Sequence, residues 1–210
     1  AIAKALFLQS AVVVSLVLTA SKAAIIMTDN LQSELLSDSS DAHHWVTCYL
    51  GLGSNLANEL DSPVNHLKRA LARIQADENI RQVKVSSLYT SVPMGPQDQP
   101  DFVNAVVGFE TTLSAFHLLI LCQHLEQQAE RERVRHWGER SLDVDILLYG
   151  QEQIVEPQLT IPHVGITERN FVLVPLKEIA PKVIIAGKSI EDYPLSKDWT
   201  GLKLFNETSS

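Results

Sequence analysis

The sequence has little positive charge and few aromatic residues. Its 25 aspartates and glutamates outnumber its 17 lysines and arginines, the formal net charge is -8, and aromatic residues make up 6% of the chain. Proteins that bind nucleic acids need a basic surface to meet the phosphates. We therefore do not expect this chain to bind nucleic acids.

Cysteine is also scarce. Cys48 and Cys122 lie far apart in the sequence, and neither has the neighbouring His or Cys residues of a zinc site. Isolated cysteines of this kind are usually buried and reduced. We expect two reduced core thiols, which fit a cytoplasmic protein.

The chain lacks a long apolar run. Residues 11–18 form an apolar stretch with Lys4 before it and small residues after it, the outline of a signal peptide or a weak membrane anchor. The stretch is shorter than the roughly 20 residues that cross a bilayer, so we expect no stable membrane association. Since the first methionine is Met27, we favour an upstream extension that results from a misplaced start.

Size and composition favour one folded domain. The chain has 210 residues, 45% of them hydrophobic, with no internal repeat, which is enough for a single sizeable core. We expect residues 1–44 to be an extension, disordered or not native, and residues 45–210 to be one catalytic domain that works as a monomer.

Hydrophobic periodicity predicts an alternation of strands and helices. The predicted strands run from Val46 to the turn at residues 53–55 and over residues 83–89, 102–111 and 142–149, and the predicted helices cover residues 63–76 and 114–129. This order is that of an α+β, ferredoxin-like antiparallel sheet with helices packed on one face. The residues after 150 should add short elements around it.

Two aspartates in the last predicted strand give the sharpest chemical signal. Alternate side chains of a strand point to opposite faces, so Asp143 and Asp145 would share one face, about 6 to 7 Å apart along the strand. The other face would carry Leu142, Val144, Ile146 and Leu148. Paired carboxylates suit Mg²⁺ together with substrate phosphates. The alternative is the solvated polar face of an edge strand.

A cationic run precedes these aspartates in the otherwise acidic chain. It comprises Arg131, Arg133, Arg135, His136 and Arg140. Guanidinium groups bind polyphosphate oxygens and offset charge during transfer. The alternative is a solvated helix end, which would explain only Arg131 and Arg133 of this run. The neighbouring Trp137 and Gly138 suggest a mobile loop. The sequence has no phosphate-binding P-loop and no dinucleotide fingerprint, so nucleotide binding would depend on metal ions and arginines.

Four longer motifs occur in order along the chain. They are G-S-N-L at residues 53–56, V-P-M-G-P-Q-D-Q-P-D-F-V-N-A at 92–105, H-W-G-E-R-S-L-D-V-D-I-L-L-Y-G at 136–150 and L-T-I-P-H at 159–163. On these motifs, over about residues 46–181, the chain resembles the 6-hydroxymethyl-7,8-dihydropterin pyrophosphokinase family. The resemblance implies transfer of a diphosphate from ATP to the hydroxymethyl group of the pterin, with release of AMP, in folate biosynthesis.

The resemblance also implies roles for matching residues. Asp143 and Asp145 would hold two Mg²⁺ ions on the ATP phosphates, Arg131 and Arg140 would steady the diphosphate, and Asn55 would brace a loop. The ATP side would comprise Gln123, Glu126, Arg133, His136, Ile146, Gln158, Thr160, His163 and Arg169. The pterin slot would comprise Phe102, Asn104, Trp137 and Phe171, with main-chain groups from Ser91, Pro93, Met94 and Gly95. Aromatic faces and an amide suit a flat bicycle.

Several residues depart from the family pattern. These are Phe102 for a frequent tyrosine, Val92 for a proline, Val164 for an aromatic residue, His136 for an arginine and Glu130 for a small residue. We expect them to tune affinity, and Glu130 to alter the cationic loop. Two alternative functions stay open. One is a phosphotransferase acting on another flat heterocyclic alcohol, and the other is a catalytically silent nucleotide or pterin sensor.

Overall fold

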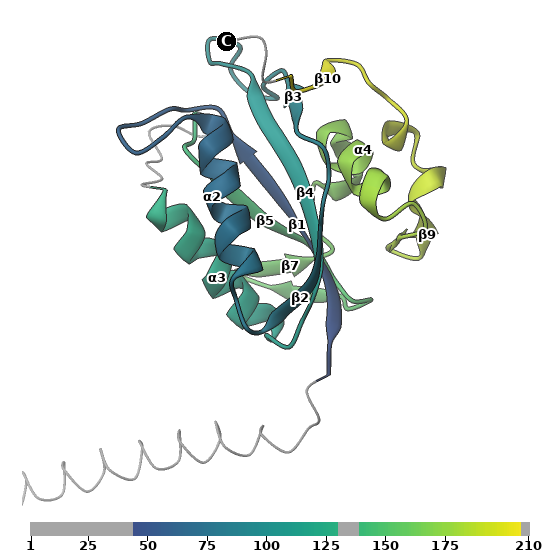
Figure 1. The fold of residues 1–210 in the computed structure, drawn as a ribbon. Coiled ribbons are helices and arrows are strands. Elements are labelled where there is room, and N and C mark those ends of the chain that lie inside the picture. Colours follow the sequence, from purple (N-terminus) through teal and green to yellow (C-terminus); the bar gives the residue numbers. More distant parts are fainter. Residues whose placement is uncertain (1–43, 130–138, 207–210) are drawn as a thin grey trace, which may run out of the picture. The chain divides into compact units, whose positions relative to one another are not determined.

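The computed structural model describes residues 44–129 and 139–206. Its centre is a six-stranded antiparallel sheet in which β10, β3, β4, β1 and β5 lie side by side and β2 also pairs with β4 (Figure 1). The strands are β1 (Val46–Ser54), β2 (Ile80–Val85), β3 (Tyr89–Ser91), β4 (Phe102–Thr111), β5 (Asp143–Tyr149) and β10 (Leu202–Leu204). The predicted ferredoxin-like plan is confirmed.

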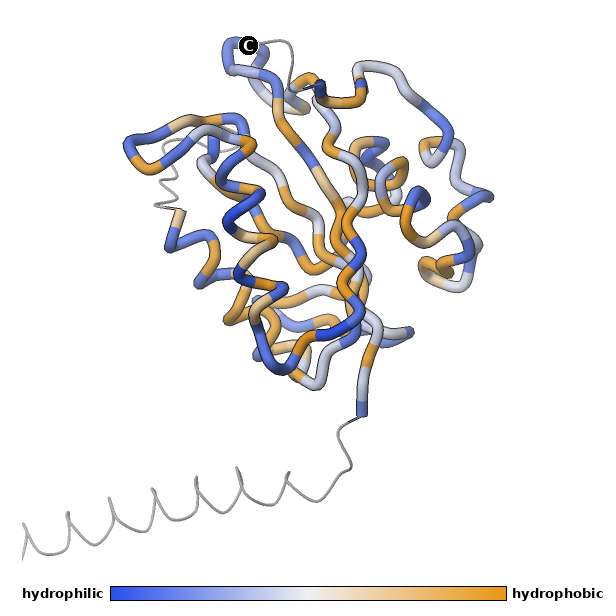
Figure 2. The backbone as a smooth tube through the Cα atoms, viewed as in Figure 1, coloured by the Kyte–Doolittle hydropathy of each residue, from blue (hydrophilic) through white to orange (hydrophobic). Residues whose placement is uncertain are grey.

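Two helices cover one face of this sheet. They are α2 (Pro63–Gln75) and α3 (Ala115–Gln128). Each begins after a serine whose hydroxyl accepts a main-chain N–H of the first turn, Asn65 for Ser62 and His117 for Ser114. In Figure 2 hydrophobic residues follow the central strands, whereas hydrophilic residues are frequent on α2. The helices therefore bury one apolar side each and leave the other to solvent.

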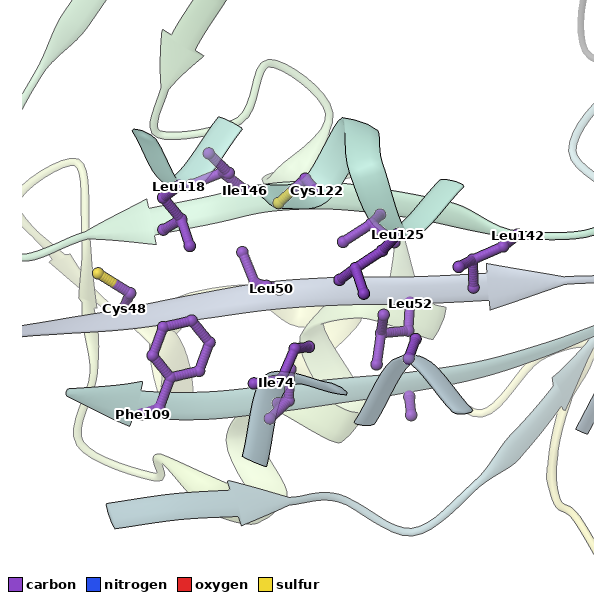
Figure 3. Close-up of a cluster of buried hydrophobic side chains, with 14 of the residues drawn as sticks. Cys48, Leu50, Leu52, Ile74, Phe109, Leu118, Cys122, Leu125, Leu142 and Ile146 are labelled. Atoms are coloured by element: carbon purple, nitrogen blue, oxygen red, sulfur yellow. The ribbon is translucent and has the colours of Figure 1, made fainter. Parts of the chain in front are cut away.

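The core between the helices and the sheet contains the predicted apolar residues. Figure 3 shows Leu118, Cys122 and Leu125 of α3 above the β1 side chains Leu50 and Leu52. Both cysteines are free and buried, and burial raises the pKa of each thiol. The expected core thiols are thus confirmed.

The opposite face of the sheet is covered as well. Helix α4 (Asn170–Ile179) contacts β4, and its residues Val172 and Leu173 share a second apolar cluster with Val106 and Leu147. Figure 1 shows α4 across the sheet from α2 and α3. The two predicted helices pack on one face as expected, and α4 adds a cover on the other face, because β4 presents apolar side chains to both faces.

Strand β5 departs from simple alternation. Its pairing with β1 shifts between Tyr49 and Leu50, so that Leu148 faces Tyr49, Ile146 faces Leu50 and Leu147 has no partner on β1. The extra residue is a β-bulge, which changes the face that following side chains occupy. Ile146 accordingly packs in the core under α3, whereas Leu147 and Leu148 pack in the cluster with α4. The prediction that Leu148 shares a face with Ile146 was wrong.

The strand predicted at residues 83–89 is two strands, β2 and β3. Between them, Ser86 and the main chain of Val106 exchange hydrogen bonds, with Ser86 N donating to Val106 O at 2.9 Å and Val106 N donating to Ser86 Oγ at 3.0 Å. Ser87 then donates to the carboxylate of Glu178 on α4. These bonds turn the chain at residues 86–88.

The remaining elements follow β5. They are β6 (Ile154–Glu156), β7 (Leu159–Ile161), β8 (Ile184–Ile185), β9 (Lys188–Ser189) and the 3₁₀ turns η2 (Ile166–Glu168), η3 (Ile190–Asp192) and η4 (Pro194–Ser196). Strands β6 and β7 pair with each other, as do β8 and β9. Over residues 44–129 and 139–206, no helix has both the length and the apolar character to cross a membrane.

Candidate active site

A cavity of about 310 Å³ lies on the sheet face that α4 covers. Its floor comes from the end of β1 and the starts of β4 and β5, and its walls come from the loop after β3, the segment after β7 and the start of α4. Gly51 and Gly53 of β1 line the floor. A Cβ at Gly53 would lie 3.4 Å from Asn104 Oδ1, and one at Gly51 would lie 3.4 Å from Leu147. These glycines leave the floor open for a ligand.

One side of the cavity gathers opposite charges. Asp143 and Asp145 of β5 line it together with His163 and Arg169. The Oδ2 atom of Asp145 lies 3.6 Å from His163 Nε2 and 3.8 Å from Arg169 Nη1. Asp143 forms an ion pair with Arg140. The predicted pairing of the two aspartates on one face of β5 is confirmed, because Val144 and Ile146 point into the opposite core.

The charges on this side are incompletely balanced. Burial and the neighbouring charge of Asp143 raise the pKa of Asp145, although His163, Arg169 and Arg140 oppose the rise. Burial lowers the pKa of His163, against the attraction of Asp145. Both shifts mean that the charged forms are less well solvated in the cavity than in open water. An added cation beside the carboxylates would be stabilised there.

Main-chain groups hold His163 in place. Its N–H donates to Leu147 O of β5 at 3.0 Å, and Gly165 N–H donates to His163 Nδ1 at 3.1 Å. Because Nδ1 accepts this bond, the proton of a neutral imidazole lies on Nε2, the atom nearest Asp145. His163 therefore presents an N–H donor to the charged side of the cavity.

The carboxylate pair fits a magnesium ion that shares its coordination with phosphates. Within the described part of the chain, no group of three or more His, Cys, Asp and Glu side chains is arranged as a metal cage. Mg²⁺ is commonly bound by one or two carboxylates, with phosphate oxygens and water completing an octahedron. Asp143 and Asp145 supply that donor set at the edge of an open cavity.

The other side of the cavity is neutral. Asn104 Nδ2 donates to Ser91 Oγ at 2.9 Å, and both residues are buried. Phe102 and Phe171 line this side and are half-buried, and Met94 and Gly95 come from the adjacent loop. The neutral side thus combines aromatic surface with one fixed amide.

Asn55 connects two segments that border the cavity. Its Nδ2 donates to Gln99 Oε1 at 3.1 Å and to Pro100 O at 3.0 Å, and its Oδ1 accepts from Arg140 N at 2.8 Å. Asn55 is 3% exposed. It braces the loop before β4, as predicted, and also holds the main chain of Arg140.

The cavity brings together many, but not all, of the residues proposed for the site. Those that line it are Ser91, Met94, Gly95, Phe102, Asn104, Arg140, Asp143, Asp145, His163, Arg169 and Phe171. Those placed elsewhere are Pro93, which is buried in its loop, Gln123 on the exposed side of α3, and Gln158 and Thr160 on the β6–β7 hairpin. Arg131, Arg133, His136 and Trp137 lie outside the described residues.

Two further proposed ATP contacts have structural partners. Ile146 packs in the core under α3. The Oε1 atom of Glu126 accepts the main-chain N–H of Val144 at 3.0 Å, which fixes the strand between the two aspartates. Their contacts with ATP stay predictions.

Sequence reasoning missed part of the cavity floor. Gly51, Val106 and Leu147 line the floor as well, and Val172 lines the wall that α4 forms. The available signal was the pair Gly51 and Gly53, two positions apart in a strand, since glycines in a strand often mark a close approach of a ligand. The apolar residues give no such signal, because their patterns are also those of ordinary core.

Comparison with known proteins identifies the family. The model of the family described as 7,8-dihydro-6-hydroxymethylpterin-pyrophosphokinase matches residues 49–181. The chain belongs to this pyrophosphokinase family. A relative from Haemophilus influenzae, named 2-amino-4-hydroxy-6-hydroxymethyldihydropteridine pyrophosphokinase, is 49% identical over 145 residues, which cover 69% of this chain and 88% of the relative. A relative of the same name from Bacillus subtilis is 37% identical over 161 residues, 77% of this chain and 91% of the relative.

Solved structures support the pyrophosphokinase fold. The crystal structure of wild-type Plasmodium falciparum HPPK-DHPS matches with a TM-score of 0.54 and 15% identity, over 75% of this chain and 45% of that chain. The chain thus spans less than half of that longer protein, and the likeness concerns the fold. The family inferred from the four motifs is confirmed, and the roles of single residues stay predictions.

Proposed function

We propose that this chain transfers a diphosphate from ATP to 6-hydroxymethyl-7,8-dihydropterin and releases AMP, as a step of folate biosynthesis. Membership of the pyrophosphokinase family supports the reaction. The observation that carries the proposal is a single cavity in which a carboxylate pair lies on one side and a neutral slot with a fixed amide on the other. Such a cavity suits a polyphosphate beside a flat heterocycle.

The charged side would bind ATP. Asp143 and Asp145 would hold Mg²⁺, which supplies charge neutralisation and alignment of the phosphates. Arg169 and the Nε2–H of His163, both close to Asp145, would donate to phosphate oxygens. Arg140, paired with Asp143 before binding, would contact the diphosphate, and Arg131 is proposed to act with it.

The neutral side would bind the pterin. Phe102 and Phe171 offer aromatic faces to the bicycle, and Asn104 offers an amide to its edge. Because Ser91 Oγ accepts from Asn104 Nδ2, the amide orientation is fixed before the ligand arrives. This preorganisation favours one orientation of the ring, with the hydroxymethyl group towards the phosphates.

The proposed transfer balances without a cofactor beyond ATP and Mg²⁺. The pterin hydroxyl oxygen forms a bond to the β-phosphorus of ATP, and the bond from that phosphorus to the oxygen bridging it to the α-phosphorus breaks. AMP leaves with the bridging oxygen, and the hydroxyl proton passes to solvent. The residues mainly position the two substrates in line and neutralise charge.

Four further features belong to the proposal. Residues 45–210 form the catalytic domain, which is supported by the extent of the described fold from β1 to β10. Two Mg²⁺ ions are bound, which the two carboxylates support. The enzyme acts as a monomer, since one chain supplies both sides of the cavity. Its location is the cytoplasm, in keeping with the two free core thiols.

The test is AMP formation from ATP and Mg²⁺ with a panel of flat heterocyclic alcohols. AMP that appears with 6-hydroxymethyl-7,8-dihydropterin and not with the other alcohols supports the proposal. Equal turnover of another alcohol would show that the assigned acceptor is wrong, and formation of ADP would show that the enzyme transfers the γ-phosphoryl group instead of a diphosphate. Tight ATP binding with no AMP above background would indicate a silent sensor.

A further inference from the structure

Asn170 lies between two residues that line opposite sides of the cavity. Arg169 approaches Asp145 on the charged side, and Phe171 lines the neutral side. The Asn170 side chain has other partners. Its Nδ2 donates to Asp198 O at 3.2 Å and to Thr200 O at 2.9 Å. Asn170 therefore attaches the start of α4 to the C-terminal part of the chain.

The segment that Asn170 holds, residues 198–204, is called here the C-terminal strap. The strap continues into β10, which pairs with β3 so that Leu202 faces Ser91. Gly201 O accepts from Val92 N at 3.2 Å, immediately after Ser91. Figure 1 shows β10 beside β3. The strap thus also reaches Ser91 and Val92, which line the cavity from a different element than Phe171.

Side-chain packing joins the same two walls. Leu202 of the strap is 4% exposed and clusters with Tyr89 of β3 and Val174 of α4, and Phe171 packs against this cluster. The ring of Trp199 lies 5.6 Å from the ring of Tyr89. The strap therefore packs against both β3 and α4, the elements that carry Ser91 and Phe171.

The strap lies beyond the family match, which ends at residue 181. Nothing in the motifs at residues 53–163 refers to it. We propose that Asn170 is a positioning residue of the pterin slot, which acts through the C-terminal strap to fix the distance between Phe171 and the Ser91–Asn104 wall. This inference rests on the proposed function, because it takes the slot to be the pterin site.

The mechanism is a mechanical link made of hydrogen bonds in series. Asn170 fixes Asp198 and Thr200, the strap fixes Val92 and Ser91, and Ser91 accepts from Asn104. Loss of the Asn170 hydrogen bonds to the strap would let Phe171 move away from Ser91 and Asn104, which weakens contact with a flat ligand. Asp143 and Asp145 belong to β5, which pairs with β1 at the far edge of the sheet from the strap strand β10, so ATP binding should be less affected than pterin binding.

The test compares Asn170→Ala with Asn65→Ala, a matched control. Asn65 lies near the start of α2 and donates to Asp61 Oδ1 at an exposed site, outside the cavity lining. We expect Asn170→Ala, which removes both hydrogen bonds to the strap, to raise the KM for the pterin about fivefold, with kcat and the KM for ATP within about twofold. Asn65→Ala should leave all three unchanged. An unchanged pterin KM in Asn170→Ala, or an equal rise in both KM values, overturns the proposal.

A second substitution tests whether the link runs through the strap. Gly201 has a φ of +68°, and a Cβ there would lie 3.0 Å from Val92 Cγ2, so Gly201→Ala should loosen the strap at its other end. Because the two sites act in series, the double variant should be no worse than the worse single variant. Effects on pterin KM that multiply would overturn the serial link.

Hydrogen exchange of the substrate-free protein separates this inference from the proposed function. In Asn170→Ala the amide of Val92 should exchange faster than in the wild type, whereas amides of α2 should not change. If the wild type forms no AMP with the pterin, the proposed function fails and the exchange result still decides the link. Unchanged exchange at Val92 would overturn it.

Discussion

The two sides of the cavity differ in how completely folding satisfies their polar groups. On the neutral side, Asn104 and Ser91 are 5% exposed each and share a hydrogen bond of 2.9 Å. On the charged side, Asp145 is 37% exposed and lies 3.6 Å from His163 and 3.8 Å from Arg169. On the neutral side, the hydrogen bond is thus formed before a ligand binds. On the charged side, metal and phosphate would supply the missing partners of the carboxylates.

This difference follows from the cost of burying charge. A buried neutral amide needs hydrogen-bond partners, which the protein can supply permanently. Two carboxylates on one strand face repel each other, and the repulsion is relieved best by a mobile cation that arrives with the substrate.

Removing a carboxylate from the charged side should have the largest effect. Asp145→Ala is expected to lower kcat at least roughly 1000-fold, because it removes a ligand for the metal that neutralises the transferring diphosphate. Asp143→Ala should act similarly. Steady-state AMP formation measures the effect, with Asp192→Ala on the exposed turn η3 as a control. A near-normal kcat of the Asp145→Ala enzyme would contradict the assignment of Asp145 as a metal ligand.

Removing the amide from the neutral side should affect the pterin alone. Asn104→Ala is expected to raise the KM for the pterin about 10- to 100-fold, because Ser91 and the ligand both lose a partner in a buried site. The KM for ATP should change less than about twofold. Thr111→Val is the matched control, since Thr111 is also buried and donates a hydrogen bond, to Asn79 O, at the other end of β4. Equal changes in both KM values would break the division into two sides.

The pH profile should reveal the balance of charges around Asp145. Arg169 lowers the pKa of Asp145 against the effects of burial and of Asp143. Arg169→Ala removes this influence, so the pKa should rise and the acid limb of kcat/KM should move to higher pH. Arg81→Ala, which breaks a surface pair with Glu110, serves as the control. A shift of the acid limb to lower pH would contradict the electrostatic account.

The negative charge of Asp145 should reduce the stability of the folded protein in the absence of ligands. Since the folded-state pKa of Asp145 is raised, its contribution to stability is present at low pH and is lost as pH rises through that pKa. Asp145→Asn should therefore raise Tm at neutral pH by about 1 to 3 °C, a modest gain because the carboxylate is 37% exposed and screened by water. Calorimetry without Mg²⁺ and ATP measures it. A lower Tm would show that the ion pairs outweigh the repulsion.

The smallest effect is expected at the aromatic edge of the slot. Phe102→Tyr should leave kcat and both KM values within about twofold, because Phe102 is half-buried and the added hydroxyl can reach the solvent at the cavity mouth. Phe102→Ala, which removes the aromatic face, provides the contrast and should raise the KM for the pterin. A Phe102→Tyr enzyme as impaired as Phe102→Ala would mean that the slot is closed at this position.

Local sequence patterns predicted the parts of the fold that obey simple periods. The stripe of Leu118, Cys122 and Leu125 and the paired faces of Asp143 and Asp145 are direct results of helix and strand geometry. Helix α4 does not follow such a pattern, because the run from Phe171 to Leu176 is apolar on every side and contains Pro175. Such a run shows no period, so the helix on the second face could not be read from it.

Other features depend on contacts between distant segments. The bulge at Leu147 arises from pairing with β1, and no residue of β5 alone signals it. The residues lining the cavity were largely predicted from the family resemblance, whereas the floor at Gly51 and the link from Asn170 to the strap appear only when the chain is folded. These three features depend on tertiary contacts, which a local sequence pattern does not predict.

The most direct test of the central claim follows the β-phosphate of ATP. The wild-type enzyme would be given Mg²⁺, 6-hydroxymethyl-7,8-dihydropterin and ATP labelled in the β-phosphate, with Asp145→Ala as the control. The account predicts that the label moves to the pterin while unlabelled AMP accumulates, and that the control transfers none. Label that stays in ADP, or that reaches the pterin in the control, would contradict diphosphate transfer at the aspartate pair.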